Sequence, residues 1–220
     1  MKLDQRTITI LKNFAAINNG LSVKKGNVIS TINTGRSVLA KATVKDSFSE
    51  NFAIYDLNRF LATLSLFDEP EIDLQEKSMT IKDKKQSVDY TYCEEEFILT
   101  PPDKKLDIEH GDIEFHLSGE NLQSLLKAAA VMKFPNIAVV GDVTNGVSIT
   151  AFDAKNPTSD KFSINVDTNV SNFKIVFKTE LFRMINDNYD VQISKSGIAQ
   201  FTASDIIYWI AVERELSSFS

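Results

Sequence analysis

Residue types that most often carry catalysis or bind metals are sparse in this chain and poorly spaced for either role. The two histidines, His110 and His116, have no serine, cysteine or further histidine at a catalytic or metal-binding spacing. Cys93 is the only cysteine, which excludes an internal disulfide and a cysteine zinc cluster. The glycines are isolated and form no phosphate-binding loop. We therefore expect no enzymatic activity, no metal and no cofactor.

Basic side chains on helices are the pattern that could bind a ligand. The net charge is −6, so the chain on average repels polyanions. Four predicted helices nevertheless carry a basic residue on the outward face, and two more basic residues flank helix ends. Two interpretations remain open: ordinary solubilising charges, or a basic surface facing a polyanion, whose phosphates such side chains bind without reading sequence. The four are Lys12, Arg59, Lys127 and Arg183, and the flanking pair is Arg6 and Lys133.

Four amphipathic segments would position these side chains. Each has apolar residues at helical spacing, and a polar residue that could cap its first turn precedes or opens most of them. The caps expected are Asp4 or Thr7, Ser118 and Thr179. The predicted helices are residues 7–18, 57–67, 119–133 and 179–188.

Most of the remaining chain alternates between apolar and polar residues, which is typical of strands. Residues 213–220 read as a polar tail. The predicted strands of the first half are residues 21–24, 27–32, 37–44, 53–55, 71–74, 78–82 and 87–93. Those of the second half are residues 113–117, 137–140, 146–152, 161–166, 173–177, 191–194, 198–203 and 206–212.

The chain contains one unit twice. Residues 51–67, NFAIYDLNRFLATLSLF, and residues 172–187, NFKIVFKTELFRMIND, share the order Asn-Phe, strand, helix, about half a chain apart. Pro101 and Pro102 interrupt the strand pattern between the halves, because proline cannot continue a ladder. The sequence thus predicts an α+β fold with two similar domains, residues 1–100 and 113–220, joined by a connector at 101–112. No apolar run is long enough to span a bilayer and no signal segment opens the chain, so we expect a cytoplasmic protein.

Three stretches carry a family resemblance that covers the chain from end to end. They are MKLDQRTITILKNFAAINNGL at the start, FAIYDLNRFLATLSL at residues 52–66 and SGENLQSLLKAA at residues 118–129. These stretches resemble the DNA polymerase sliding clamps of T4-type bacteriophages, which belong to the PCNA-like clamp family. The first two are specific to the family, whereas the leucine-rich third is not specific by itself.

The resemblance implies a homotrimeric ring with pseudo-sixfold symmetry, in which sheets form the outer wall and two short helices per domain line the hole. Double-stranded DNA threads the ring without sequence preference, so the clamp tethers the replicative polymerase by topology. An ATP-driven clamp loader opens the ring, and such clamps also activate late transcription. In that setting the protein works in the cytoplasm of the infected host cell, and the six basic residues above face DNA.

Two further sites follow from the resemblance. Ring closure pairs an edge strand of one domain with an edge strand of the next subunit, and a partner-peptide pocket lies under the connector. By position, the edge strands contain Ser87, Val88, Asp89, Tyr90, Thr91, Tyr92, Lys161, Phe162, Ser163 and Ile164. The pocket candidates are Ile32, Val38, Phe97, Ile98, Leu99, Tyr208, Ala211 and Val212.

An alternative from a different class stays open. A β-rich protein that oligomerises for assembly, without encircling DNA, would share the repeat and the absence of catalytic groups. The charge on the helix faces and the behaviour on circular DNA distinguish the two.

Overall fold

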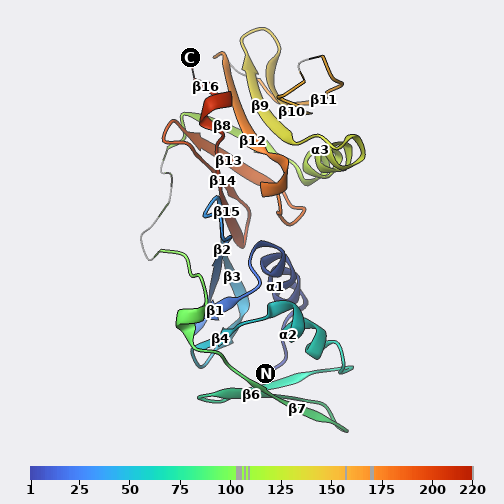
Figure 1. Ribbon diagram of the computed structural model, residues 1–220, viewed down its shortest axis with the longest axis vertical. Coiled ribbons are helices and arrows are strands. Elements are labelled where there is room, and N and C mark those ends of the chain that lie inside the picture. Colours follow the sequence, from blue (N-terminus) through green and yellow to red (C-terminus); the bar gives the residue numbers. More distant parts are fainter. Residues whose placement is uncertain (103–105, 107, 109, 157, 169–170, 220) are drawn as a thin grey trace. The chain divides into compact units, whose positions relative to one another are not determined.

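The chain forms two compact units, Met1–Lys104 and Lys105–Ser220, and each is described by itself (Figure 1). The structure is a computed structural model that describes the chain except residues 103–105, 107, 109, 157, 169–170 and 220. The division falls inside the predicted connector. Both units combine sheets with helices, so the predicted α+β class with two similar domains is confirmed.

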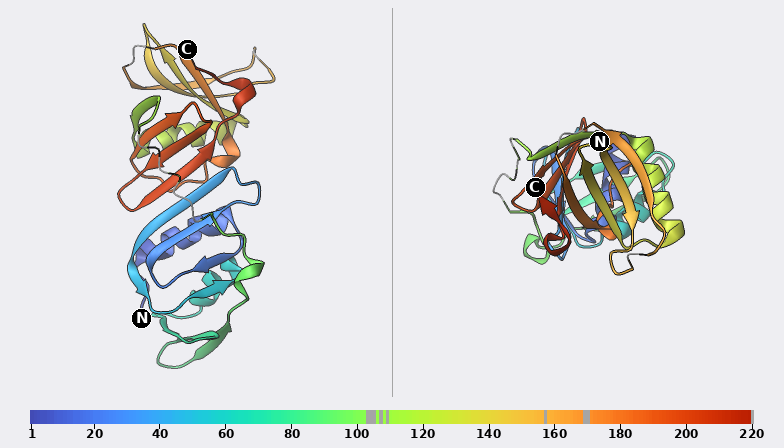
Figure 2. Two further views of the ribbon diagram at one scale, coloured as in Figure 1. Left: turned by 90° about the vertical axis from the view of Figure 1, so that its left-hand side faces the viewer. Right: turned by 90° about the horizontal axis from the view of Figure 1, so that it is seen from above.

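Unit 1 places its two helices, α1 (Gln5–Ile17) and α2 (Leu57–Leu64), side by side, and α1 packs on β2 and β3 (Figure 2, left). One run of strands has the order β4-β1-β2-β3, and β5-β6-β7 form a separate antiparallel meander. A 3-10 turn, η1 (Glu95–Phe97), follows the last strand. The strands are β1 (Leu21–Val23), β2 (Gly26–Ile32), β3 (Val38–Phe48), β4 (Phe52–Ile54), β5 (Glu71–Leu74), β6 (Ser78–Lys82) and β7 (Ser87–Thr91).

Unit 2 has one α-helix among its described residues, α3 (Gly119–Met132), which packs on β10 and β11. Its strands run in the orders β11-β10-β9-β12-β16 and β15-β14-β13-β8. Two 3-10 turns complete it, η2 (Thr179–Leu181) and η3 (Arg214–Leu216). The strands are β8 (Ile113–Leu117), β9 (Asn136–Asp142), β10 (Gly146–Phe152), β11 (Phe162–Asp167), β12 (Phe173–Lys178), β13 (Tyr189–Ser194), β14 (Ile198–Thr202), β15 (Ile206–Ala211) and β16 (Ser218–Phe219).

The two units repeat one topology. The order β4-β1-β2-β3 in unit 1 corresponds to β12-β9-β10-β11 in unit 2, and the meander β5-β6-β7 corresponds to β13-β14-β15. The segment before the first helix also lies against the first meander strand in both units. In unit 2, β8 pairs with β13, and in unit 1 the backbone of Met1 hydrogen-bonds Ile72 of β5. The internal repeat inferred from residues 51–67 and 172–187 is thus present at the level of strand order.

Each unit buries its own apolar core between helix and sheet. In unit 1, Ile10 and Phe14 of α1 are fully buried, as is Leu57 of α2. In unit 2 an aromatic cluster takes this role, with Phe201 in edge-on contact with Phe177 and Phe182. Edge-on aromatic pairs add to the free energy gained by burying their area, so these side chains fix how the sheets face each other within the unit.

Two predicted elements differ from the structure. The predicted helix at residues 179–188 is only the 3-10 turn η2, so unit 2 lacks the second helix expected for each domain. The predicted polar tail contains η3 and β16, and β16 pairs with β12. At the first place the Ile185 N–H donates to the Tyr208 hydroxyl, and at the second the backbone pairs with β12.

Candidate nucleic-acid interface

Helix α1 presents Lys12 on its exposed side. The carboxylate of Asp4 caps the helix by accepting from the Arg6 N–H at 2.9 Å. The buried side is formed by Thr7, Ile10, Leu11, Phe14 and Ile17. The Lys12 side chain is exposed and Arg6 is half-buried.

Helix α2 presents Arg59 in the same way. Asp56 caps it by accepting from the Arg59 N–H at 2.9 Å, and Leu57, Phe60 and Leu64 form its buried side. The ring of Phe60 meets Tyr90 of β7 edge-on, with centroids 5.6 Å apart. This packing holds the helix on the meander and leaves the Arg59 side chain exposed.

Helix α3 exposes Lys127 and ends at Lys133. Ser118 caps the first turn by accepting from the Asn121 N–H at 3.2 Å, as predicted. Lys133 adopts the left-handed conformation, with φ of 56°, which stops the helix and leaves its side chain exposed. Beside it lies an apolar pair that helical spacing did not single out, Val131 and Met132, which are 72% and 46% exposed.

Arg183 does not lie on a helix. It follows η2, is exposed, and donates from Nε to the Glu180 carbonyl at 3.2 Å. The predicted outward position on a fourth helix is therefore wrong, although the side chain still reaches the surface.

Charge on the three helices is opposite in sign to that of the chain. Their sequences contain four basic residues, Arg6, Lys12, Arg59 and Lys127, and one acidic residue, Glu120. The chain as a whole has 24 basic and 30 acidic residues. A local positive surface on an acidic protein attracts polyanions over about a Debye length, roughly 8 Å at physiological salt.

Among the described strands, the two predicted for ring closure each lie at the edge of their own sheet. β7 ends the meander β5-β6-β7, and β11 ends the order β11-β10-β9-β12-β16. Each carries half-buried side chains alternating with exposed ones. The half-buried sets are Val88, Tyr90 and Tyr92 in and after β7, and Phe162, Ile164 and Val166 in β11. The exposed members of the predicted set are Ser87, Asp89, Thr91, Lys161 and Ser163.

The predicted peptide-pocket residues fall into surface and core positions. Phe97 is 65% exposed in η1, whereas Ile98 is buried close to Gly20. Leu99 and Ala211 are half-exposed, and Ile32, Val38 and Val212 are buried. Tyr208 is fully buried and packs on Tyr189 with centroids 6.1 Å apart, so its predicted place in a pocket is wrong.

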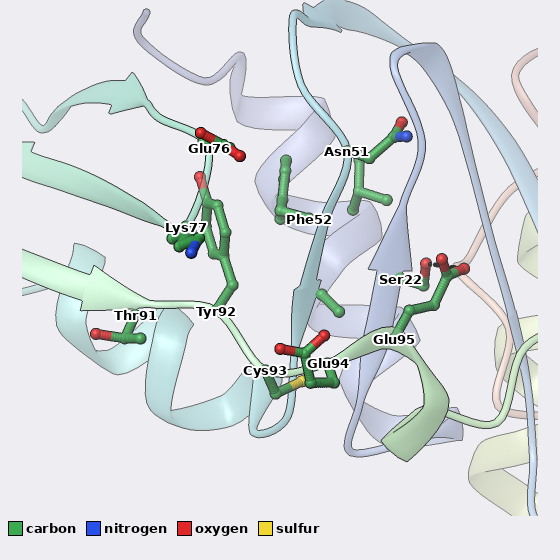
Figure 3. Close-up of a pocket in the computed structure, with 12 residues that line it drawn as sticks. Ser22, Asn51, Phe52, Glu76, Lys77, Thr91, Tyr92, Cys93, Glu94 and Glu95 are labelled. Atoms are coloured by element: carbon green, nitrogen blue, oxygen red, sulfur yellow. Dashed lines mark hydrogen bonds between the residues drawn. The ribbon is translucent and has the colours of Figure 1, made fainter.

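His116 and Cys93 belong to different units. His116 Nδ1 lies 3.1 Å from Asp190 Oδ1, and both side chains are exposed. Burial raises the pKa of the half-buried Cys93 thiol (Figure 3). Among the described residues, no cluster of three or more His, Cys, Asp or Glu could hold a metal. No described helix is long and apolar enough to cross a membrane.

A two-unit fold of this topology with basic helices is that of a DNA clamp, and comparison with known proteins agrees. The family described as "DNA polymerase processivity factor" matches residues 2–99, and "gp45 sliding clamp, C terminal" matches residues 114–214. The sliding clamp of Vibrio phage KVP40 is 36% identical, over 97% of this chain and 99% of its own length. The sliding clamp of phage T4 is 27% identical over 98% of both chains. The chain belongs to the sliding clamp family of polymerase processivity factors.

Solved structures show the same fold at low identity. Archaeal PCNA, in a structure titled "C-terminal region of FEN-1 bound to A. fulgidus PCNA", has a TM-score of 0.72 at 11% identity, covering 96% of each chain. PCNA from Entamoeba histolytica has a TM-score of 0.68 at 12% identity, covering 94% of each. This likeness supports the PCNA-like architecture of the units.

Proposed function

We propose that this chain forms a closed homotrimeric ring that encircles duplex DNA and tethers the replicative polymerase. The observation that carries the proposal is the reversed charge of the helices, which hold four basic residues and one acidic residue in an acidic chain. Lys12, Arg59 and Lys127, exposed on α1, α2 and α3, would face the duplex, with Arg6, Lys133 and Arg183 beside them. Contacts to phosphate without base readout permit sliding.

Ring closure would join β7 of one subunit to β11 of the next. Among the described strands both lie at the edge of their sheet, and proteins rarely leave the backbone groups of such an edge exposed when the strand is apolar. Antiparallel pairing would satisfy those groups and cover the half-buried rows that include Val88 and Tyr90 on one strand and Ile164 on the other.

The partners follow from the proposed role. An ATP-driven loader would open the ring, and the polymerase and late-transcription factors would each insert a short apolar peptide of their own into a pocket on its surface. Within unit 1, the exposed Phe97 and half-exposed Leu99 are the residues available for such contact; within unit 2, Ala211 is. We propose no catalytic activity for the chain itself.

Retention on circular and linear DNA tests the topological mechanism. With a cognate loader and ATP, the clamp should stay on a nicked circle and run off a linear fragment of the same sequence. Blocking both ends of the linear fragment should restore retention. Equal retention on circle and open fragment would exclude encirclement and favour the assembly protein considered as the alternative.

A further inference from the structure

A row of polar side chains crosses one face of a sheet in unit 2. Cross-strand partners in the order β8-β13-β14-β15 supply it, and such partners lie on the same face of a sheet (Figure 1). The neighbouring residue Val191 of β13 is buried on the opposite face, which packs on the core. The polar row consists of Glu114, Gln192, Gln200 and Trp209.

Hydrogen bonds join the polar row from end to end and run in one direction. Trp209 Nε1 donates to Gln200 Oε1 at 2.8 Å, and Gln200 Nε2 donates to Gln192 Oε1 at 3.3 Å. Gln192 Nε2 then donates to Glu114 Oε1 at 3.0 Å. An indole N–H only donates and a carboxylate only accepts, so the two ends impose the same orientation on both amides between them.

Glu114 is the ionised end of the row. The hydrogen bond from the Gly111 N–H and the one from Gln192 hold the pKa of its carboxyl below the ordinary value. Its side chain is exposed, whereas Gln200 and Trp209 are buried. A charge at the surface thus orients a buried amide two strands away.

The chain that leads into β8 binds the acceptor oxygens of this row. The Ile108 N–H donates to Gln200 Oε1 at 3.0 Å, and the Gly111 N–H donates to Glu114 Oε1 at 2.9 Å. Both backbone groups therefore depend on the direction of the row, because a reversed amide at Gln200 would present N–H groups instead of an oxygen.

Two further contacts fix where this chain crosses the sheet. A Cβ on Gly111 would lie 3.0 Å from Gln192 Cβ and 3.1 Å from its Cα, so the chain passes over β13 at a distance that suits glycine. The Asp112 carboxylate accepts from the Lys195 N–H, in the turn after β13, at 2.7 Å. We call Ile108, Gly111 and Asp112 the strap.

The strap contributes little to the apolar core. Ile108 and Gly111 are half-buried and Asp112 is exposed, whereas Val191, on the opposite face of the sheet, is buried. Segments held by a few hydrogen bonds at partly exposed positions open at a lower free energy than the whole domain unfolds. The strap can therefore detach while the sheet beneath it stays folded.

We propose that the strap is a latch that fixes the end of the connector on unit 2, and that Glu114 sets how tightly it holds. Glu114 binds Gly111 directly and acts on Ile108 as a positioning residue, through the amides of Gln192 and Gln200. Without the charge, both amides can rotate and Gln200 can turn an N–H group toward Ile108. The latch goes beyond the proposed function because it needs neither DNA nor a residue outside unit 2.

Amide hydrogen exchange of the deuterated, ¹⁵N-labelled full chain, followed by nuclear magnetic resonance, tests whether the strap opens by itself. The amides of Ile108 and Gly111 should be protected relative to an unstructured peptide. They should nevertheless exchange at least about tenfold faster than the amide of Val191 in the sheet. Exchange at the rate of Val191 would show that the strap opens only when unit 2 unfolds. Exchange as fast as in a free peptide would show that the strap is not held.

The variant Glu114→Gln tests the positioning role, because it removes the charge and keeps the size of the side chain. Exchange at Ile108 should rise about threefold to tenfold, as for the loss of one hydrogen bond. The indole N–H signal of Trp209, the only tryptophan, should shift, and exchange at Val191 should stay the same. Glu215→Gln, at an exposed glutamate of η3, should change none of the three. Unchanged signals in Glu114→Gln, or equally faster exchange at Val191, would overturn the positioning role.

The variant Gly111→Ala tests the crossing with Glu114 intact. The added methyl group would meet Gln192 of β13, so the strap should open more often and exchange at Ile108 should rise. Exchange at Val191 should again stay the same. An unchanged rate at Ile108 in this variant would show that the strap does not lie against β13, which would overturn the latch.

Discussion

The side-chain oxygen of Asn172 accepts a hydrogen bond from the backbone N–H of Val143 at 3.2 Å. In unit 1, Asn51 does the same for the N–H of Lys25 at 2.7 Å. In each unit the asparagine precedes the strand that pairs with β1 or β9, and it holds the turn at the end of that partner strand. The asparagine of the Asn-Phe pair that marks the repeat thus stabilises the turn after the neighbouring strand by a hydrogen bond. This role explains why an asparagine occurs in both copies.

Replacing Asn172 with alanine should lower the free energy of unfolding by about 1 kcal/mol, because the turn N–H loses its protein acceptor but remains accessible to water. Asn51→Ala should cost a similar amount. Urea unfolding followed by circular dichroism measures both. Asn27→Ala, at an exposed asparagine of β2, is the control. An equal loss of unfolding free energy there would show that the effect does not come from the turn hydrogen bonds.

Gln200 is a second position where one side chain holds distant backbone and side-chain groups together. Its Oε1 accepts from Trp209 Nε1 at 2.8 Å and from the Ile108 N–H at 3.0 Å, and both Gln200 and Trp209 are buried. Gln200→Leu should cost about 1–3 kcal/mol, because the buried indole N–H loses its acceptor. Trp209, the only tryptophan, reports unfolding by fluorescence. Gln123→Leu, at an exposed position of α3, should leave the unfolding midpoint nearly unchanged.

Sequence periodicity predicted most elements but failed at residues 179–188. Leu181, Phe182 and Met184 are all buried, which is a denser pattern than one helical face provides. The Ile185 N–H donates to the Tyr208 hydroxyl at 3.2 Å, and its carbonyl accepts from the Tyr189 hydroxyl at 2.6 Å. Two tyrosines of the meander thus take backbone groups that a helix would pair internally. Tyr208 lies 23 residues along the chain from Ile185, so no local pattern reveals that bond.

In the candidate site, too, some residues could be predicted from the sequence and others depend on tertiary packing. Exposure of Lys12, Arg59 and Lys127 follows from helical spacing, so the sequence alone could predict it. From the sequence, Tyr208 is a strand residue that could belong to a pocket or to the core. Its packing against Tyr189 places it in the core.

Glu95 gives a pH-dependent contribution to the stability of unit 1. Hydrogen bonds from Lys24 and Ser22 hold the pKa of its carboxyl below the ordinary value of 4.5. A depressed pKa stabilises the fold above the unfolded-state pKa, and this contribution is lost as the pH falls through the folded-state pKa. Glu95→Gln should therefore be less stable than wild type at neutral pH, and the difference should shrink below about pH 4.5. Urea midpoints across pH 3–7, with Glu96→Gln as the exposed neighbouring control, test this sign.

Reversing Lys12 and Lys127 to glutamate should impair loading on DNA and leave the fold intact, because both side chains are exposed. Each lost phosphate contact lowers the slope of log affinity against log salt by roughly one. Retention on nicked circles at rising salt measures the effect. The matched double variant Lys41→Glu and Lys155→Glu has the same change in net charge at exposed positions outside the helices, and it should load normally. Equal defects in the two would show that only net charge matters.

Assembly through the edge strands β7 and β11 can be tested independently of DNA loading. Val88 and Ile164 are half-buried on strands that end their sheets, so a glutamate at either position can reach water in a free subunit. In a joined edge the same carboxylate would be desolvated without a partner, which costs several kcal/mol. Val88→Glu or Ile164→Glu should therefore yield folded monomers at concentrations where the wild type sediments as a trimer.

Val28→Glu is the matched control, since Val28 is already 42% exposed and lies on β2, inside the order β4-β1-β2-β3. It should leave the trimer intact. A trimer that survives both edge variants would place the subunit contact elsewhere. Loss of folding in the variants, seen by circular dichroism, would instead show that Val88 and Ile164 belong to the cores of their own units.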